Sequence, residues 1–410
     1  MAQTLKFGNK TWATKEGSTL AYNDENGNYK PLPFAFTRST SATRVNKEGL
    51  IEVVTNDRPR IDYTDTSDGV LLLEKAATNR FLYSEDLTQF NLSSSGTGAS
   101  NPVVTSNYGV SPDGTQNADR VQLDAGTDAS GNSRITETFT IFATTETISV
   151  YLKSNDGQEH TIDIIQSNSP QNTATVTSEW KRFSFTNVNG SPDKYGIGLT
   201  GSNGETADIL AWGFQLEQNS VASSYIPTQG SATTRVAETA TGSGNSEVFN
   251  DSEGVLFADI AANSDYGGVR AISLNDGSVL NRISIRYNST SNQIQYQYTS
   301  GGSVQVNITS NVADVKTPHK IAVKYKLNDF ELFIDGFSRG TDLIGNVMPS
   351  GTLTNLDING SSVYDYFYGK TKEIGYYNTI LTDLELETLT SYKSWTSMVN
   401  ELNLNIIYNG

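Results

Sequence analysis

The chain has 410 residues, of which 36% are hydrophobic and 18% are charged, and its formal net charge is -16. This length accommodates two or three domains with cores of their own. The negative charge argues against a nucleic-acid partner, because phosphate binding needs clustered lysine and arginine. The absence of cysteine excludes disulfides and thiolate chemistry.

The distribution of apolar residues disfavours two further classes of protein. No stretch approaches the roughly 18 consecutive apolar residues that cross a bilayer, so we expect no membrane insertion. Residues 1–7 (MAQTLKF) contain no apolar segment of the secretory type. We therefore expect a chain that is made in the cytoplasm without a signal peptide.

The first 80 residues contain many turn signals and little alternation of apolar and polar residues. The segment from Asp24 to Asn28 is typical of a tight turn, and Pro31 and Pro33 favour extended chain. We interpret residues 1–80 as an extended arm. It would pack on the second domain or on a neighbouring subunit, or attach the protein to a larger assembly.

Residues 81–230 contain short apolar alternations separated by turns. Strands are predicted at 148–152, 162–164, 183–185 and 197–199, where apolar residues recur at every second position. Glycine, asparagine and aspartate gather between these strands, as turns with positive φ require. This spacing favours a β-sandwich of the jelly-roll type.

The last predicted strand of this region is strongly apolar. Leu210, Trp212, Phe214 and Leu216 occupy alternate positions, which predicts one apolar strand face with Trp212 in the core. Pro227 follows in a polar stretch and fixes an extended backbone. We interpret that stretch as a tether to the next domain.

Residues 231–395 predict a second β-sandwich, followed by a tail at 396–410. The Asp335-Gly336 pair between two apolar runs predicts a hairpin, and Thr382 with Glu385 fits the capping box of a short helix. Residues 402–408 alternate like a strand that could add to a sheet edge of this chain or another. The predicted fold is all-β, with two β-sandwich (jelly-roll) domains in tandem, an extended N-terminal arm and a short C-terminal helix.

Several phrases of the sequence resemble a known group of proteins. They are WGFQLE (212–217) followed by SYIPT (224–228) and TRVA (234–237), FTRSTSATRVNKEGL (36–50), and GVLLLEKAATNRFLYSED (69–86). These phrases are similar to segments around a carbohydrate-binding-type jelly roll in bacteriophage tail and virion-surface proteins. Residues 246–389 resemble a concanavalin A-like sandwich of the laminin-G type.

The resemblance implies a virion structural protein, such as a tail fibre, spike or head fibre, that binds host surface glycans during adsorption without catalysis. The implied partners are other virion proteins and a host cell-surface glycan, and the implied assembly is a homo-oligomer, with a trimer favoured. Two alternatives are a purely structural capsid decoration or collar protein and a glycan depolymerase.

The sequence contains no catalytic motif. Its two histidines, His160 and His319, accompany neither a G-x-S-x-G elbow nor a P-loop. Hydrolases of the concanavalin A-like type carry Glu-x-Asp-x-Glu on one strand, and no Glu-x-Asp occurs here. The nearest run, Asp383, Glu385 and Glu387, falls in the predicted helix. We therefore predict a protein that is not an enzyme and uses no cofactor.

Candidate ligand-binding residues are tyrosines that share a strand face. Tyr364, Tyr366 and Tyr368 form one such set, and Tyr296 with Tyr298 forms a second. Aromatic faces stack on sugar rings, but tyrosines are also frequent in half-buried sheet positions. Both interpretations stay open at this stage.

Two short loops contain oxygen ligands of the kind that calcium prefers. They are Asn263 to Asp265 and Asn355 to Asp357, each with one carboxylate. A calcium ion needs more oxygen ligands than one carboxylate per loop supplies, and such residues are common in turns. We therefore predict no metal site.

Overall fold

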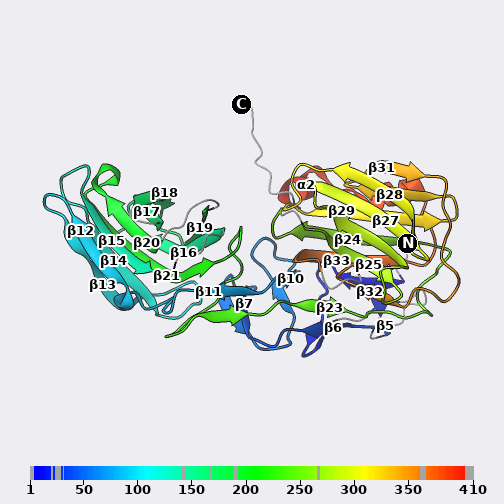
Figure 1. The fold of residues 1–410 in the computed structure, drawn as a ribbon, viewed down its shortest axis with the longest axis horizontal. Helices are drawn as coiled ribbons and strands as arrows, with labels where there is room; N and C mark the ends of the chain where they lie inside the picture. The colour runs from blue at the N-terminus through cyan, green and yellow to red at the C-terminus, as the bar shows by residue number, and fades with distance from the viewer. Residues whose placement is uncertain are drawn as a thin grey trace. The chain divides into compact units, whose positions relative to one another are not determined.

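A computed structural model describes residues 4–19, 22–23, 29–30, 32–140, 145–166, 169–187, 193–265, 268–360 and 366–401. Nearly all of its regular structure is β, which confirms the predicted all-β class (Figure 1). The chain divides into two compact units. Unit 1 comprises residues 1–41, 54–75 and 237–410, and unit 2 comprises residues 42–53 and 76–236.

Unit 2 contains two antiparallel five-stranded sheets around one apolar core. One sheet has the order β12 (Asn91–Ser95), β15 (Asn132–Thr138), β20 (Lys194–Thr200), β17 (His160–Gln166) and β18 (Ser169–Val176). The other has the order β13 (Ser100–Gly109), β14 (Ala118–Asp124), β21 (Thr206–Glu217), β16 (Glu146–Ser154) and β19 (Lys181–Asn187). The predicted apolar positions of β16, β17 and β20 are buried in this core.

Strand β21 departs from the predicted alternation because it contains a bulge. Gly213 has φ of 69°, and the pairing of β21 with β16 shifts register beside it. A bulge adds one residue and moves the following side chains to the opposite face. Phe214 and Leu216 therefore face the sheet-to-sheet core, whereas Trp212 packs in a second cluster with Tyr225. The prediction that Trp212 shares a face with Phe214 is wrong, but Trp212 is buried as expected.

Unit 1 is also a sandwich, and its core draws on both of its large sheets. The first has the order β31 (Phe337–Asp342), β30 (Phe330–Ile334), β29 (His319–Lys326), β24 (Glu253–Ala262), β33 (Gly369–Tyr377), β10 (Val70–Leu73) and β9 (Arg60–Asp62), and β1 (Leu5–Gly8) also pairs with β33. The second has the order β28 (Ser303–Asn311), β27 (Gln293–Ser300), β26 (Arg282–Tyr287), β25 (Arg270–Asn275) and β32 (Asn355–Asp357).

The remaining strands are short. A four-stranded sheet has the order β2 (Thr14–Lys15), β3 (Ser18–Thr19), β6 (Phe34–Thr37) and β23 (Thr239–Thr241). Three two-stranded ribbons pair β4 (Tyr22–Asn23) with β5 (Tyr29–Lys30), β7 (Ala42–Val45) with β8 (Ile51–Val54), and β11 (Ala77–Asn79) with β22 (Thr233–Arg235).

The described part of the N-terminal 80 residues packs on later parts of the chain, which is one of the arrangements that the sequence predicts for the arm. Strands β1 and β10 pair with β33 near the other end of the chain, and Leu5 and Phe7 are buried in the unit 1 core. These pairings cover the edge of β33 and bury apolar side chains that a free arm would expose to water. The predicted boundaries near 80 and 230 lie a few residues from those of unit 2 at 76 and 236.

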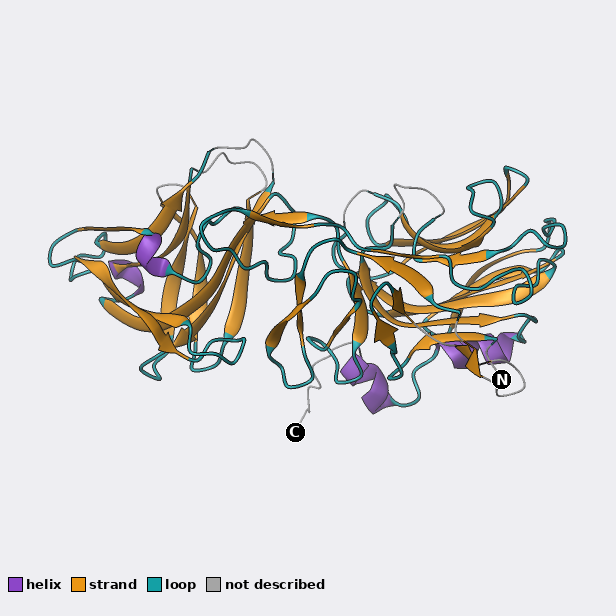
Figure 2. Ribbon diagram, turned by 90° about the horizontal axis from the view of Figure 1, so that it is seen from below, coloured by secondary structure: helices purple, strands orange, loops and turns teal. Residues whose placement is uncertain are grey.

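The predicted hairpin and helix are both present. Asp335 and Gly336 connect β30 to β31 with φ of 51° and 83°, as a type I′ turn requires. Helix α1 (Asp383–Thr390) begins with the capping box of Thr382 and Glu385, and a second helix, α2 (Trp395–Glu401), follows. Figure 2 shows how little helix accompanies the strands. The predicted turn at 24–28 and the predicted tail strand at 402–408 lie outside the described residues.

A buried ionic cluster connects distant parts of unit 1. The Glu238 carboxylate accepts hydrogen bonds from Arg38 at 2.6 Å, from Arg60 Nε at 2.8 Å and from the Glu74 N–H at 2.9 Å. Burial by itself lowers the pKa of Arg60, but the charges of Glu238 and Glu74 outweigh it and raise that pKa. The side chains of Arg38, Arg60 and Glu238 are fully buried, so water cannot replace these contacts.

We predict that Glu238→Gln strongly destabilises unit 1. The substitution leaves two buried guanidinium groups without their shared anion, and breaking a buried ion pair in this way costs about 3–5 kcal/mol. Denaturant unfolding measures the loss. The control is Glu253→Gln, because the Glu253–Lys326 pair at 3.0 Å is partly exposed and pairs of that kind contribute about 0–1 kcal/mol. Equal losses in the two variants would contradict the prediction.

Candidate functional site

The tyrosine pair Tyr296 and Tyr298 lies in the unit 1 core. Both side chains on β27 are fully buried. The Tyr296 hydroxyl donates to the Lys324 carbonyl at 3.1 Å, and the Tyr298 hydroxyl accepts from the Met348 N–H at 2.9 Å. Rings buried on both faces cannot stack on a sugar. The core interpretation is therefore correct for this pair, and its assignment as a ligand site is wrong.

The second tyrosine set is only partly within the described residues. Tyr364 lies outside them. Tyr366 and Tyr368 are half-buried, with ring centroids 5.9 Å apart, and Phe367 between them is buried in the core. The predicted alternation holds over these three residues. Ligand binding by Tyr366 and Tyr368 stays a prediction.

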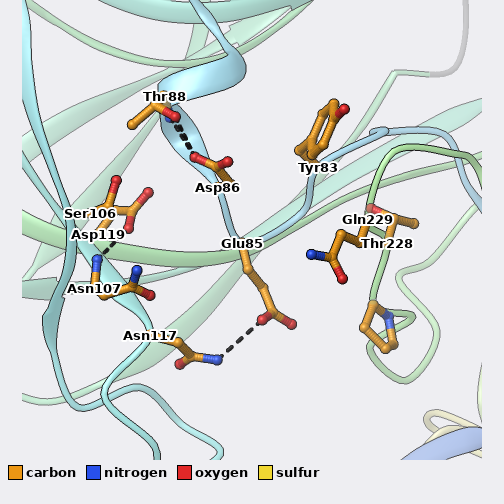
Figure 3. Close-up of a pocket in the computed structure, with 11 residues that line it drawn as sticks. Tyr83, Glu85, Asp86, Thr88, Ser106, Asn107, Asn117, Asp119, Thr228 and Gln229 are labelled. Atoms are coloured by element: carbon orange, nitrogen blue, oxygen red, sulfur yellow. Dashed lines mark hydrogen bonds between the residues drawn. The ribbon is translucent and has the colours of Figure 1, made fainter.

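Unit 2 contains a surface cavity of about 470 Å³ (Figure 3). Four separate segments supply its walls: the chain before and within the 3-10 helix η1 (Leu87–Gln89), strand β13, the start of β14, and the polar stretch after β21. The lining residues are mostly carboxylates, amides and hydroxyls, namely Tyr83, Glu85, Asp86, Thr88, Ser106, Asn107, Asn117, Asp119, Pro227, Thr228 and Gln229.

Backbone contacts place one wall of the cavity. Tyr83 and Gln229 form an isolated antiparallel bridge, and the Gly230 N–H donates to the Leu82 carbonyl at 2.7 Å. In the same wall the Ser84 hydroxyl accepts from the Thr228 N–H at 2.9 Å, and the Ser84 N–H donates to the Thr228 hydroxyl at 3.0 Å. The side chains of Tyr83 and Gln229 therefore extend from two backbone segments that pair with each other at the edge of the cavity.

Glu85 is positioned by neutral donors on both of its oxygens. The Tyr225 hydroxyl donates to Oε1 at 2.7 Å, and Asn117 Nδ2 donates to Oε2 at 3.1 Å. Figure 3 shows the Gln229 side chain pointing toward the same carboxylate. Burial is the main cause that raises the pKa of Glu85, and the nearby Asp113 and Asp119 raise it further.

The bulge in β21 contributes to this arrangement. It turns Trp212 toward Tyr225, and the two ring centroids are 4.5 Å apart. A Cβ atom at Gly213 would lie only 3.1 Å from the Tyr151 ring and 3.3 Å from the Tyr225 ring, so the bulge needs glycine. Packing of the Tyr225 ring thus directs its hydroxyl to Glu85.

Two more carboxylates border the cavity, and both support local structure. Asp119 accepts the N–H of Leu87 at 2.8 Å and the N–H of Asn107 at 2.9 Å, so it connects two walls. Burial raises the pKa of Asp119. Asp86 caps η1 by accepting the Thr88 N–H at 3.1 Å. Every oxygen of Glu85 and Asp119 thus accepts one protein hydrogen bond and retains capacity for another.

The other chemistry considered from the sequence is not assembled in the described part of the chain. Neither histidine lines the cavity: His160 contacts Asp156 at 2.9 Å and His319 contacts Asp335 at 2.6 Å. Among the residues described, no group of three or more His, Asp or Glu side chains is arranged to bind a metal. No described helix has the length and apolar character needed to cross a membrane.

Sequence reasoning missed this cavity, although a signal was present. Its residues come from segments between 83 and 229, and none carries a catalytic or binding motif. Two of the phrases that carry the resemblance, 69–86 and 224–228, meet here through Ser84 and Glu85 on one side and Tyr225 and Thr228 on the other. The presence of both segments in one sequence was therefore the signal that could have indicated this site.

Comparisons with known proteins found similar structures but no related sequence. No protein family matches the chain, and no curated protein matches it. The IT-sialidase CBM40 of Ruminococcus gnavus is 15% identical over 37% of this chain and 94% of its own, with a TM-score of 0.32. Domain 4 of an extracellular arabinanase of Geobacillus stearothermophilus, in complex with arabinotriose, is 10% identical over 42% and 84%, with a TM-score of 0.31.

A third similar structure spans more of the chain. The sialidase of Trypanosoma rangeli, in complex with the inhibitor DANA, is 10% identical over 92% of this chain and 66% of its own, with a TM-score of 0.29. These neighbours are glycan-binding or glycan-active proteins by their descriptions.

We predict that Glu85 makes unit 2 less stable as the pH rises. Its pKa is raised in the folded protein, so the folded state binds the proton more tightly than the unfolded state. The stabilisation that comes from the proton on Glu85 is fully present below the pKa of the unfolded state, which is about 4.3. It is lost as the pH rises through the pKa of Glu85 in the folded state. Glu85→Gln should therefore gain stability relative to wild type between pH 4 and pH 8, measured by denaturant unfolding across that range.

The control for this pH dependence is Glu179→Gln. Glu179 is exposed, and the substitution makes the same change in net charge. Its unfolding free energy should stay parallel to that of wild type at every pH. A Glu85→Gln curve that also stays parallel would show that Glu85 is not the source of the dependence.

Proposed function

We propose that this chain is a non-catalytic glycan-binding protein and that the unit 2 cavity is its binding site. The observation that carries the proposal is the convergence of positioned carboxylates and amides beside the half-buried ring of Tyr83. Sugar recognition needs hydrogen-bonding groups for hydroxyls and an aromatic surface for C–H faces. The cavity volume of about 470 Å³ is within the range of ligand sites, roughly 300–1,000 Å³.

The hydrogen bonding of the carboxylates favours binding over cleavage. Glycoside hydrolysis needs two carboxyl groups about 5–10 Å apart that can exchange protons with the substrate. Here Glu85 and Asp119 each accept structural hydrogen bonds on both oxygens. One observation supports a depolymerase as the second candidate: the pKa values of both carboxyls are raised within one cavity.

The biological setting follows from the resemblance in the sequence. A glycan-binding sandwich pair with linker phrases similar to those of phage virion-surface proteins suits a tail fibre, spike or head fibre in the virion. In that setting the protein contacts host surface glycans, and its other partners are virion proteins in a homo-oligomeric, trimeric assembly. A purely structural decoration or collar protein is the alternative that needs no glycan.

We predict that Gln229→Ala and Tyr83→Leu each weaken glycan binding. Removing one hydrogen-bonding amide costs about 0.5–1.5 kcal/mol, roughly 2- to 13-fold in affinity. Removing the ring costs a similar amount. Binding of purified protein to extracted bacterial surface polysaccharide measures both effects, with sizing of the polysaccharide afterwards.

The matched control is Tyr366→Leu, a tyrosine in unit 1 that the sequence singled out. Its affinity should equal that of wild type. Loss of binding in Tyr366→Leu but not in Tyr83→Leu would move the site to unit 1. Shortened polysaccharide would support a depolymerase, and absence of binding to any surface glycan would favour the structural role.

A further inference from the structure

The unit 2 cavity is acidic and has no positive side chain of its own. Glu85, Asp86 and Asp119 line it, and the described lining residues include no lysine, arginine or histidine. We infer that the cavity selects glycans that present hydroxyl and free amino groups and rejects glycans that carry carboxylates. This inference rests on the proposed glycan-binding function and specifies its ligand class.

The hydrogen-bond partners of these carboxylates are all neutral. Glu85 accepts from a tyrosine hydroxyl and an asparagine amide, and Asp119 accepts from two backbone N–H groups. Asp86 accepts from Thr88 and from the amide of Gln89. None of the three forms an ion pair with another described residue. Their negative charges therefore remain available to a ligand.

The nearest cation along the chain is directed elsewhere. Arg120 follows Asp119 on β14, and successive side chains of a strand point to opposite faces. Its guanidinium donates to both oxygens of Asp208, with Nε to Oδ1 at 2.8 Å, and lies over the Tyr108 ring at 5.0 Å. Arg120 therefore does not neutralise the cavity.

Ligand selection follows from these charges. A ligand ammonium group can donate charge-assisted hydrogen bonds to the free lone pairs of Glu85 and Asp119. A ligand hydroxyl can donate to the same positions with less energy. A ligand carboxylate would approach two or three like charges without a counter-ion, which is unfavourable in a partly desolvated site.

The test is a glycan array that includes neutral, amine-bearing and carboxylate-bearing glycans, followed by affinities for a matched set. That set is lactose, the same disaccharide with a free 2-amino group, and sialyllactose, all measured with EDTA present to remove bridging metals. We expect the amine to bind about tenfold tighter than the neutral sugar at low salt. Sialyllactose should not bind, and the amine preference should shrink in 0.5 M NaCl, where the Debye length falls to about 4 Å.

Three variants assign the preference to the cavity. Glu85→Gln and Asp86→Asn should each reduce the preference for the amine, and asparagine preserves the cap of η1. Glu179→Gln makes the same change in net charge at an exposed position outside the cavity and should keep the full preference. Denaturant unfolding of each variant verifies that unit 2 is folded.

The possible results separate this inference from the function on which it rests. Binding confined to carboxylated glycans, or an amine that binds no tighter than its neutral counterpart, overturns the charge selection while glycan binding stands. An unchanged preference in both Glu85→Gln and Asp86→Asn overturns the assignment to the cavity. Absence of binding to every glycan on the array overturns the proposed function and this inference together.

Discussion

The fold of unit 1 depends on the ionic contacts of one buried carboxylate, that of Glu238. The chain passes between the two units after residues 41, 53, 75 and 236. Three of these points lie within three residues of the Glu238 cluster: Arg38 precedes the first, Glu74 the third, and Glu238 follows the last. At the second point, directly after residue 53, Arg38 donates hydrogen bonds to the carbonyls of Val54 and Thr55 at 3.2 and 2.6 Å.

A neutral hydrogen-bond network has the corresponding role in unit 2. The buried Asn79 amide donates to the carbonyls of Phe214 and Ile226, both at 2.9 Å, and its oxygen accepts from the Leu216 N–H at 3.1 Å. These bonds join the start of the 76–236 segment to the end of β21 and to the stretch that carries Tyr225. Asn79 therefore fixes the backbone beside Tyr225, whose hydroxyl donates to Glu85, and this contact positions Glu85 before any ligand binds.

The two sets of tyrosines and the cavity differ in how well a sequence pattern can indicate a binding surface. Tyr296 was a candidate because alternation cannot distinguish the inner face of a sandwich from its outer face. Its hydroxyl instead satisfies a buried carbonyl in the core. The cavity consists of loop and strand-end residues, where polar side chains converge without a period that a sequence scan can detect.

The amino-acid pattern alone was sufficient to predict the all-β class, strands β16, β17, β19, β20 and β21 of unit 2, the Asp335-Gly336 hairpin and the Thr382 capping box. These features depend on residues that are neighbours in the chain, and local sterics and alternation are sufficient to specify them. Three further features became visible only in the folded chain: β1 and β10 complete a sheet with β33, β21 bulges at Gly213, and Glu85, Asn117 and Gln229 share a cavity. These contacts join residues far apart in the chain, so they depend on which apolar faces pack together once the whole chain has folded.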